Sequence, residues 1–357
     1  MNGFRELKKI FKQVIFYVLN IISKLILVEK NVNLNNINII ILFKKPLGLG
    51  DLVMLSPFVK ILENKLIGNI YILSDYEQFI EFNKVKYIKP INIDSKLLSN
   101  SLVISPTLAF TNIKYMFKAK FFLGYFISNK LISNISNIDY KYNPKNEHYL
   151  EQTFVMLDIL NIDYDKYNFD YPLMITYKYK LPFNTEYITI APYSNWKERQ
   201  YKQDKYLALI KDILNLYKQH HIILIGSSAK EELSFNETIE LSLNNRRLLN
   251  LTGKTTLTEM NYLIKNSKLF IGNDSGPANI AYILAQYTIV FFGSIDYENR
   301  LPINSQLRNK ILPLDNRNSC KYFSCYDGYN KPSCFNTNKY SCLDTSLDSI
   351  MLKKILG

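Results

Sequence analysis

Two acidic residues, Asp51 and Asp274, stand in turn-forming stretches that directly follow apolar runs of the sequence. Asp51 comes after Gly48 and Gly50, and Asp274 comes just before Ser275. A carboxylate can act as a general base where it reaches the proton that a reaction removes. A carboxylate in the first turn of a helix can also simply cap that helix. Asp51 therefore has two interpretations, a general base or a helix cap.

The sequence around Asp274, residues 268–294, is typical of strand, tight turn, helix and strand. The apolar run 269–271 stops at Gly272, and Pro277 suits the first turn of a helix. A loop of this kind places backbone N–H groups and a helix N-terminus at the carboxyl edge of a parallel sheet, where a diphosphate can bind. The alternative interpretation is an ordinary βαβ turn.

A third polar stretch, residues 194–199 with the sequence SNWKER, follows an apolar run at 187–191. Its hydroxyl and cationic groups suit a diphosphate. The alternative is a polar surface loop without a ligand.

Histidine is scarce, since the chain contains only His148, His220 and His221. None of them stands beside a glycine-rich loop, which argues against a Ser-His-Asp triad and against a histidine metal site.

Two phosphate-loop patterns are incomplete. Residues 251–255, LTGKT, end like a Walker A loop, but the required earlier glycine is Leu248. Gly48-Leu49-Gly50 begins like a dinucleotide-binding fingerprint, but its third glycine position is Val53. Nucleoside triphosphate hydrolysis and nicotinamide binding are therefore disfavoured.

The composition indicates a folded protein with an anionic partner. The chain has 357 residues, is 47% hydrophobic and carries a formal net charge of +13. Such a charge suits a nucleic acid, a membrane surface or a phosphorylated substrate. The abundance of Lys, Asn, Ile and Tyr can also reflect a biased nucleotide composition. No RNP-like, zinc-finger or basic-zipper pattern is present, so we predict no nucleic-acid partner.

All four cysteines, Cys320, Cys325, Cys334 and Cys342, lie near the C-terminus. Because the rest of the chain has none, we expect a cytoplasmic protein rather than a disulfide scaffold. The spacing lacks a CxxC pair, so a zinc site is the weaker interpretation and free thiols or a local redox pair the stronger.

The N-terminal residues 4–28 alternate apolar side chains with Lys9, Lys12 and Lys24 at helical spacing. This pattern predicts an amphipathic helix that lies in the interface of an anionic membrane. The alternatives are a helix packed on the protein itself and a single-span anchor, which the break at Lys24 disfavours. No cleavage site follows, so a signal peptide is not expected.

Strands and helices alternate along the remaining chain, which predicts an α/β fold with parallel sheets. Residues 44–51 are expected to form a loop before an apolar helix, with Ser56-Pro57 capping or kinking its first turns. We divide the chain into an amphipathic helix and linker at 1–37, an N-terminal domain at 38–180 and a C-terminal domain at 181–357. The predicted strands are 39–43, 69–73, 102–105, 187–191, 221–225, 248–251, 269–271 and 288–292.

Several segments together resemble glycosyltransferase family 9, the ADP-heptose:lipopolysaccharide heptosyltransferases. The similarity covers about residues 38–345, and its most specific part is 251–293. The segments are Gly50-Asp51-Leu52-Val53 with Pro57, AKFFLGY at 119–125, LTGKTTL at 251–257, NDSGPANIA at 273–281, FFG at 291–293, and the C-terminal cysteines.

This resemblance implies a GT-B fold, with two Rossmann-like domains facing a central cleft. It also implies an inverting, metal-independent transfer of heptose from ADP-heptose to a lipopolysaccharide or lipooligosaccharide core. The nucleotide-sugar is then a substrate, and no cofactor is expected. The acceptor would be a lipid-linked glycan, and the enzyme would lie on the inner face of the cytoplasmic membrane.

The resemblance assigns a role to each matching residue. Asp51 would be the catalytic base for the acceptor hydroxyl. Arg199 stands where the family usually has lysine, and Asn279 where it has histidine. The residues expected to bind the donor are Ser194, Asn195, Arg199, Glu231, Asp274, Ser275, Gly276, Pro277 and Asn279.

The two departures at Arg199 and Asn279 leave other functions open. One is a family member with a different nucleotide-sugar donor. Another is a catalytically inactive, membrane-bound glycan-binding protein. A nucleotide-dependent oxidoreductase on a doubly wound sheet is disfavoured by Val53.

Overall fold

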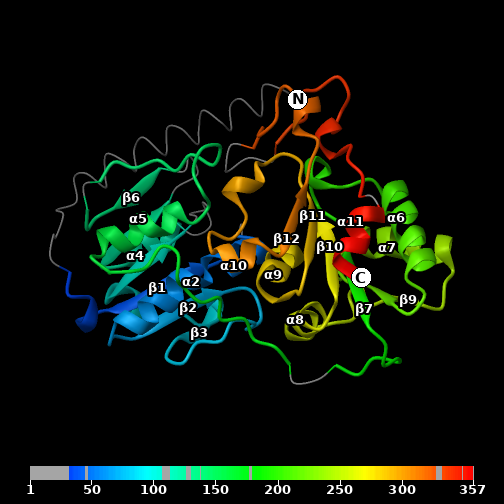
Figure 1. Ribbon diagram of the computed structural model, residues 1–357. Coiled ribbons are helices and arrows are strands. Elements are labelled where there is room, and N and C mark those ends of the chain that lie inside the picture. The colour runs from blue at the N-terminus through cyan, green and yellow to red at the C-terminus, as the bar shows by residue number, and fades with distance from the viewer. Residues whose placement is uncertain are drawn as a thin grey trace.

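Two sheets of mainly parallel strands, each flanked by helices, make up the computed structural model (Figure 1). The N-terminal domain, in blue to green, lies beside the C-terminal domain, in green to red. The structure describes residues 32–44, 47–106, 113–125, 130–136, 138–176, 179–326, 332–347 and 349–356. The expected amphipathic helix at residues 4–28 lies outside these ranges.

The first sheet has the strand order β3-β2-β1-β4-β5-β6. Its strands are parallel except for β6, which pairs antiparallel with β5. They span β1 Asn38–Phe43, β2 Ile70–Ser74, β3 Lys86–Ile88, β4 Ser101–Ser105, β5 Phe121–Tyr125 and β6 Leu131–Ser133.

The second sheet has the order β12-β11-β10-β7-β8-β9, and all its pairs are parallel. Its strands span β7 Tyr187–Ala191, β8 His221–Leu224, β9 Leu248–Asn250, β10 Leu269–Asn273, β11 Thr288–Phe291 and β12 Ile311–Leu314.

Both sheets follow the Rossmann order 3-2-1-4-5-6 when the strands of each domain are counted along the chain. The order reverses between β1 and β4 in the first sheet, and between β7 and β10 in the second. Ligands of such sheets bind beyond the carboxyl ends of the strands at this reversal. The loops after β1, β7 and β10 are therefore the expected ligand-binding loops.

Helices cover both faces of each sheet (Figure 1). Those of the N-terminal domain are α2 Leu49–Lys65, α3 Ser95–Ser99, α4 Ile113–Lys118 and α5 Glu151–Ile159. Those of the C-terminal domain are α6 Gln203–Leu216, α7 Lys230–Leu243, α8 Leu257–Lys265, α9 Gly276–Leu284, α10 Ser305–Arg308 and α11 Ser349–Leu356. Short 3₁₀ turns include η4 Lys197–Arg199 and η5 Tyr297–Asn299.

The buried apolar side chains form three layers, because successive residues of a strand face opposite sides of its sheet. In β1, Ile39 and Ile41 join the layer between the two sheets, whereas Ile40 joins the layer on the outer face. The middle layer includes side chains of α2, α5, α8 and α9 from both domains. The two domains therefore meet through a continuous apolar core.

Helix α2 begins at Leu49, so Gly50 and Asp51 lie in its first turn and not in the loop that the sequence predicted. Capping explains the earlier start, because the Asp51 carboxylate accepts the Gly48 N–H at 2.8 Å. Pro57 lies inside the helix and has no N–H for the carbonyl of Val53. The Ser56 hydroxyl donates to that carbonyl instead, at 2.8 Å, and the helix continues.

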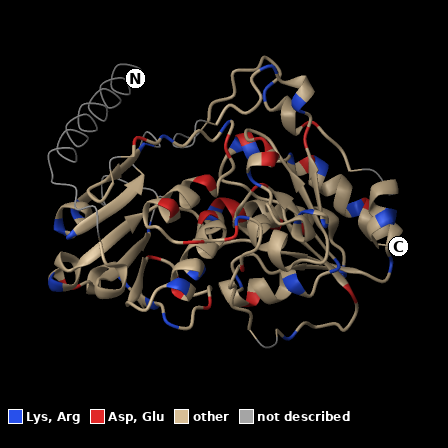
Figure 2. Cartoon of the chain, turned by 60° about the vertical axis from the view of Figure 1, so that its left-hand side comes forward, with Lys and Arg blue, Asp and Glu red and all other residues tan. Residues whose placement is uncertain are grey.

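Lysine and arginine are spread over both domains, as the blue segments of Figure 2 show. In the part of the chain that the structure describes, no helix is long and apolar enough to cross a membrane.

Candidate functional site

Asp51 lies just beyond β1, in the first turn of α2, and its side chain is partly exposed. Besides accepting the Gly48 N–H, its carboxylate lies close enough to the buried phenol of Tyr149 to act on that group electrostatically. Burial and then the Asp51 charge raise the pKa of Tyr149 well above its ordinary value, so this phenol stays protonated. Asp51 thus caps the helix and lies near a protonated hydroxyl group.

Helices α2 and α9 pack against each other between the two sheets (Figure 1), and their N-terminal ends are in contact. A Cβ atom on Gly50 would lie 2.5 Å from Nδ2 of Asn279 and 3.3 Å from Cα of Gly276. Likewise, a Cβ atom on Gly276 would lie 3.0 Å from Cβ of Leu49. The two glycines therefore let the two helix ends approach closely. Both ends carry a positive partial charge, which favours an anion near them.

The loop after β7 carries Arg199, whose Nη1 lies 3.4 Å from Oδ2 of Asp274. Asp274 follows β10 directly and is buried. The Arg199 guanidinium also lies 4.2 Å from the ring centroid of Trp196. Arginine and aspartate from neighbouring strand ends thus meet at the reversal of the strand order.

Asn273, the last residue of β10, connects these two loops. Its Oδ1 accepts the Tyr201 N–H at 3.0 Å and the Tyr206 hydroxyl at 3.1 Å. Its Nδ2 donates to the carbonyl of Pro192 at 2.9 Å. Asn273 is not among the expected site residues, although an amide side chain at the end of an apolar strand indicates a buried group that needs hydrogen-bond partners.

Buried polar atoms without a hydrogen-bond partner gather around Asp274. Within the described ranges they are Arg199 Nε, Asp274 Oδ2, Ser275 Oγ, Tyr282 OH and Ser294 Oγ. Buried polar groups are normally satisfied, and a bound ligand is one means of satisfying them. These atoms come from three loops at strand ends and from α9. Except for Asp274 Oδ2, each of them can donate a hydrogen bond to a ligand.

The other expected donor-binding residues lie at different positions. The Ser194 hydroxyl accepts the Trp196 N–H at 3.4 Å, and Asn195 is exposed beside it. Pro277 and Asn279 lie in the first turn of α9, where the Asn279 amide donates to the Ser275 carbonyl at 2.9 Å.

Glu231 is exposed in the first turn of α7. Its neighbour Glu232 lies over the end of β8, because a Cβ atom on Gly226 would come 2.4 Å from Glu232 Oε1. Burial raises the pKa of Glu232.

Arg300 is a second cation at the domain junction, and no motif in the sequence marks it. It follows η5, and its guanidinium lies 4.5 Å from the ring centroid of Tyr149. Its position depends on contacts with the N-terminal domain that no local pattern reveals.

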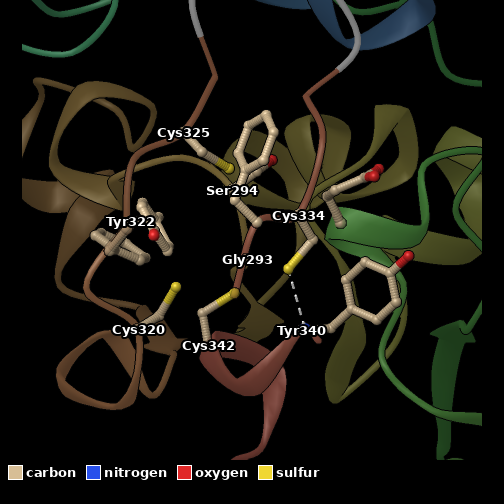
Figure 3. Close-up of a pocket in the computed structure, with 11 residues that line it drawn as sticks. Gly293, Ser294, Cys320, Tyr322, Cys325, Cys334, Tyr340 and Cys342 are labelled. Carbon is tan, nitrogen blue, oxygen red and sulfur yellow. Dashed lines mark hydrogen bonds between the residues drawn. The ribbon is translucent and has the colours of Figure 1, made fainter. Parts of the chain in front are cut away.

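The four cysteines line one pocket of the C-terminal domain, together with Gly293, Ser294 and Tyr340 (Figure 3). All four are free thiols. Burial raises the pKa of Cys342 to about 12, and the Cys334 sulfur accepts the Tyr340 N–H at 3.3 Å. Among the residues with described positions, no three His, Cys, Asp or Glu side chains are arranged to hold a metal ion.

Comparison with known proteins gives consistent matches. A model of glycosyltransferase family 9 (heptosyltransferase) matches residues 111–329. Lipooligosaccharide heptosyltransferase 2 of Campylobacter jejuni is 25% identical over 287 residues, which cover 76% of this chain and 85% of that protein.

Solved structures match the arrangement of both domains. The ADP-heptose lipopolysaccharide heptosyltransferase II of Escherichia coli has a TM-score of 0.58 at 15% identity, over 78% of this chain and 91% of that one. A glycosyltransferase family 9 protein of Veillonella parvula has a TM-score of 0.61 at 15% identity, over 79% of this chain and 88% of that one.

Proposed function

Because the chain belongs to glycosyltransferase family 9 and has the GT-B fold, we propose that it transfers heptose from ADP-heptose to a lipopolysaccharide or lipooligosaccharide core. The heptosyltransferase of Campylobacter jejuni, which matches over most of its length, supports this substrate class. In this proposal residues 38–180 hold the acceptor and residues 181–357 hold the nucleotide-sugar.

The observation that carries the proposal is the close approach of α2 and α9. It brings the helix end with Asp51 next to the helix end that follows Asp274. A transferase needs a base for the acceptor and a cation for the leaving diphosphate at one place. Asp51 meets the first need. Arg199, ion-paired with Asp274, meets the second.

In the proposed reaction, Asp51 accepts the proton of an acceptor hydroxyl. The hydroxyl oxygen then forms a bond to the anomeric carbon of the sugar, from the face opposite the leaving group. The bond between this carbon and the diphosphate oxygen breaks, and the electron pair leaves with the nucleoside diphosphate. Arg199 and the N-terminus of α9 stabilise the charge that develops on that group. The configuration of the anomeric carbon is inverted.

The experiment that tests the proposal measures transfer with the full chain and a panel of ADP-, UDP- and GDP-sugars. The acceptor is a lipooligosaccharide core that lacks heptose, and the readouts are released nucleoside diphosphate and product mass. The proposal requires heptose transfer from ADP-heptose. Transfer from another donor only would contradict the heptosyl assignment. Donor or glycan binding without any turnover would favour the inactive glycan-binding protein.

Asp51→Asn tests the base within the same assay. Asparagine can still accept the Gly48 N–H, so the cap on α2 remains. We expect transfer to fall by about 10²- to 10⁴-fold, the usual contribution of a general base. Unchanged turnover in this variant would contradict the assignment.

The proposal also places the enzyme at the cytoplasmic face of the inner membrane, through residues 4–28. Lys9, Lys12 and Lys24 would face anionic head groups. The full chain should float with phosphatidylglycerol vesicles, whereas a chain without residues 1–30 should not. Flotation of both chains would contradict this role.

A further inference from the structure

The backbone on both sides of Arg300 is bonded to the N-terminal domain. The Asn299 carbonyl accepts the Tyr149 N–H at 3.0 Å, and the Leu301 carbonyl lies 2.8 Å from Nε2 of His148. These bonds hold the segment 299–301, which belongs to the C-terminal domain, against the segment that contains Tyr149. Arg300 is therefore fixed at the junction of the two domains.

The Arg300 guanidinium lies beside two aromatic rings. It lies 4.5 Å from the ring centroid of Tyr149 and 5.9 Å from that of Tyr326. Within the described ranges it forms no ion pair and donates no side-chain hydrogen bond. Its side chain is nevertheless only partly exposed.

A guanidinium in this state has unused binding capacity. Its five N–H donors lie in the plane of the group, and within the described ranges none of them donates a hydrogen bond from the Arg300 side chain. Partial burial of a cation is costly unless an anion accompanies it. In-plane donors suit the paired oxygens of a phosphate or a carboxylate.

Arg199 converges on the same place as Arg300. Its guanidinium lies 5.5 Å from the ring centroid of Tyr326, the ring that Arg300 also approaches. Arg199 is ion-paired with Asp274, and Asp274 is also one of the groups whose charge stabilises the cationic form of Arg300. Arg199 and Arg300 together carry two positive charges, and Asp274 supplies one negative charge. One positive charge therefore remains for a ligand.

We propose that Arg300 is a second anion-binding residue of the transfer site, and that Arg199 and Arg300 together hold the diphosphate of the donor. This inference rests on the proposed function. A diphosphate carries at least two negative charges, so two arginines match it better than Arg199 with Asp274 alone. Arg300 also contacts Tyr149, whose phenol feels the charge of Asp51, so a diphosphate bound at Arg300 would lie close to the proposed base.

The same chemistry could serve an acidic group on the acceptor, since a carboxylate also binds a guanidinium in its plane. The two sources predict different results when the ligands are presented separately. Inorganic pyrophosphate represents the diphosphate without any base or sugar. A sugar acid represents the acceptor.

The test measures by calorimetry the affinity of the full chain for pyrophosphate, ADP and a sugar acid. The variants are Arg300→Gln, which removes the charge, and Arg300→Lys, which keeps it. Arg246→Ala is the control, because this exposed arginine precedes β9 and lies at the opposite, amino edge of the same sheet. Thermal unfolding of each variant shows whether it is folded.

We expect Arg300→Gln to weaken pyrophosphate and ADP binding by about ten- to a hundredfold, as the loss of a charged hydrogen-bonding partner does. Arg300→Lys should weaken it less, and Arg246→Ala should bind like the wild type. Affinity for the sugar acid should not change.

Three results would overturn the inference or its premise, each in a distinct way. Equal pyrophosphate affinity in wild type and folded Arg300→Gln would refute the role of Arg300 but not the proposed function. Loss of sugar-acid binding with unchanged pyrophosphate binding would assign Arg300 to the acceptor and refute the diphosphate role. Absence of binding of pyrophosphate and of every nucleoside diphosphate to the wild type would refute the proposed function.

Discussion

Gly50 packs against the side chain of Asn279, so that a Cβ atom on Gly50 would lie 2.5 Å from Nδ2 of the asparagine. This contact joins the first turn of α2 to the first turn of α9. The contact therefore limits the distance between the N-terminal turn of α2, which contains Asp51, and the turn before α9, which contains Asp274.

Gly50→Ala should separate the two helix ends. The added methyl group would overlap the flexible Asn279 amide and would also lie 3.3 Å from the backbone at Gly276, which cannot move independently. Overpacking of this kind costs about 1–3 kcal/mol. We expect lower heptose transfer and a lower free energy of unfolding.

Gly48→Ala is the matched control for that variant. Among the residues that the structure describes, a Cβ atom on Gly48 would meet only Asp51 Oδ2, at the ordinary contact distance of 3.5 Å. Its transfer rate and unfolding free energy should change less. Equal losses in the two variants would show that the contact between α2 and α9 is not the cause.

Gly293→Ala should displace the loop that carries Arg199. A Cβ atom on Gly293 would lie 2.0 Å from the carbonyl oxygen of Glu198, which is backbone and cannot rotate away. We expect a loss of about 1–3 kcal/mol in urea unfolding and weaker pyrophosphate binding.

Gly226→Ala offers a comparison for Gly293→Ala. There the added atom would meet the end of the Glu232 side chain, which can move. A loss in Gly226→Ala as large as that in Gly293→Ala would contradict the backbone explanation.

Local pattern was sufficient for the central strands and for the loops at their carboxyl ends. Runs such as 39–43 and 187–191 are continuous and apolar because both faces of the strand are buried. Asp274 directly follows β10, whereas Asp51 lies in α2 after β1 and Arg199 lies in η4 after β7. All three residues therefore lie at the carboxyl edges of the sheets.

The strands β3, β6 and β12 were missed, and the reason is their position. Each lies at the edge of a sheet, has three or four residues and is partly exposed. An edge strand pairs on one side only and needs no long apolar run.

Arg300 was missed for a different reason. It lies beyond η5, several residues past the end of β11, and its backbone is held by His148 and Tyr149 of the other domain. A pattern read within one segment contains no information about such contacts. Glu231, which the family pattern indicates, lies exposed in the first turn of α7, and its role in donor binding stays a prediction.

The Cys342 thiol should react slowly with iodoacetamide. Burial raises its pKa to about 12, so at about pH 8 only about one molecule in 10⁴ carries the reactive thiolate. Peptide mass spectrometry after brief labelling should find Cys342 unmodified in the native protein and modified in urea.

The labelling experiment also tests the zinc interpretation of the cysteine pocket. If a chelator made all four native thiols reactive, a bound metal would be protecting them, and the assignment of free thiols would be wrong. Labelling of native Cys342 as fast as in urea would refute its burial.

The contact between His148 and Leu301 should make the stability of the protein depend on pH. The neutral ring accepts the Leu150 N–H at Nδ1 and donates from Nε2 to the Leu301 carbonyl. Burial lowers the pKa of His148 from 6.5 to about 4. Because the folded protein then binds fewer protons than the unfolded chain, this stability is complete above pH 6.5 and is lost as the pH falls toward 4.

The loss should reach about 3 kcal/mol in urea unfolding between about pH 7.5 and about pH 4.5. His148→Gln removes the titrating group but can still donate to the Leu301 carbonyl, so its free energy of unfolding should change less over this range. The acidic residues titrate in both proteins and cancel in the comparison. An equal pH dependence in wild type and His148→Gln would show that protonation of His148 does not weaken the contact between the two domains.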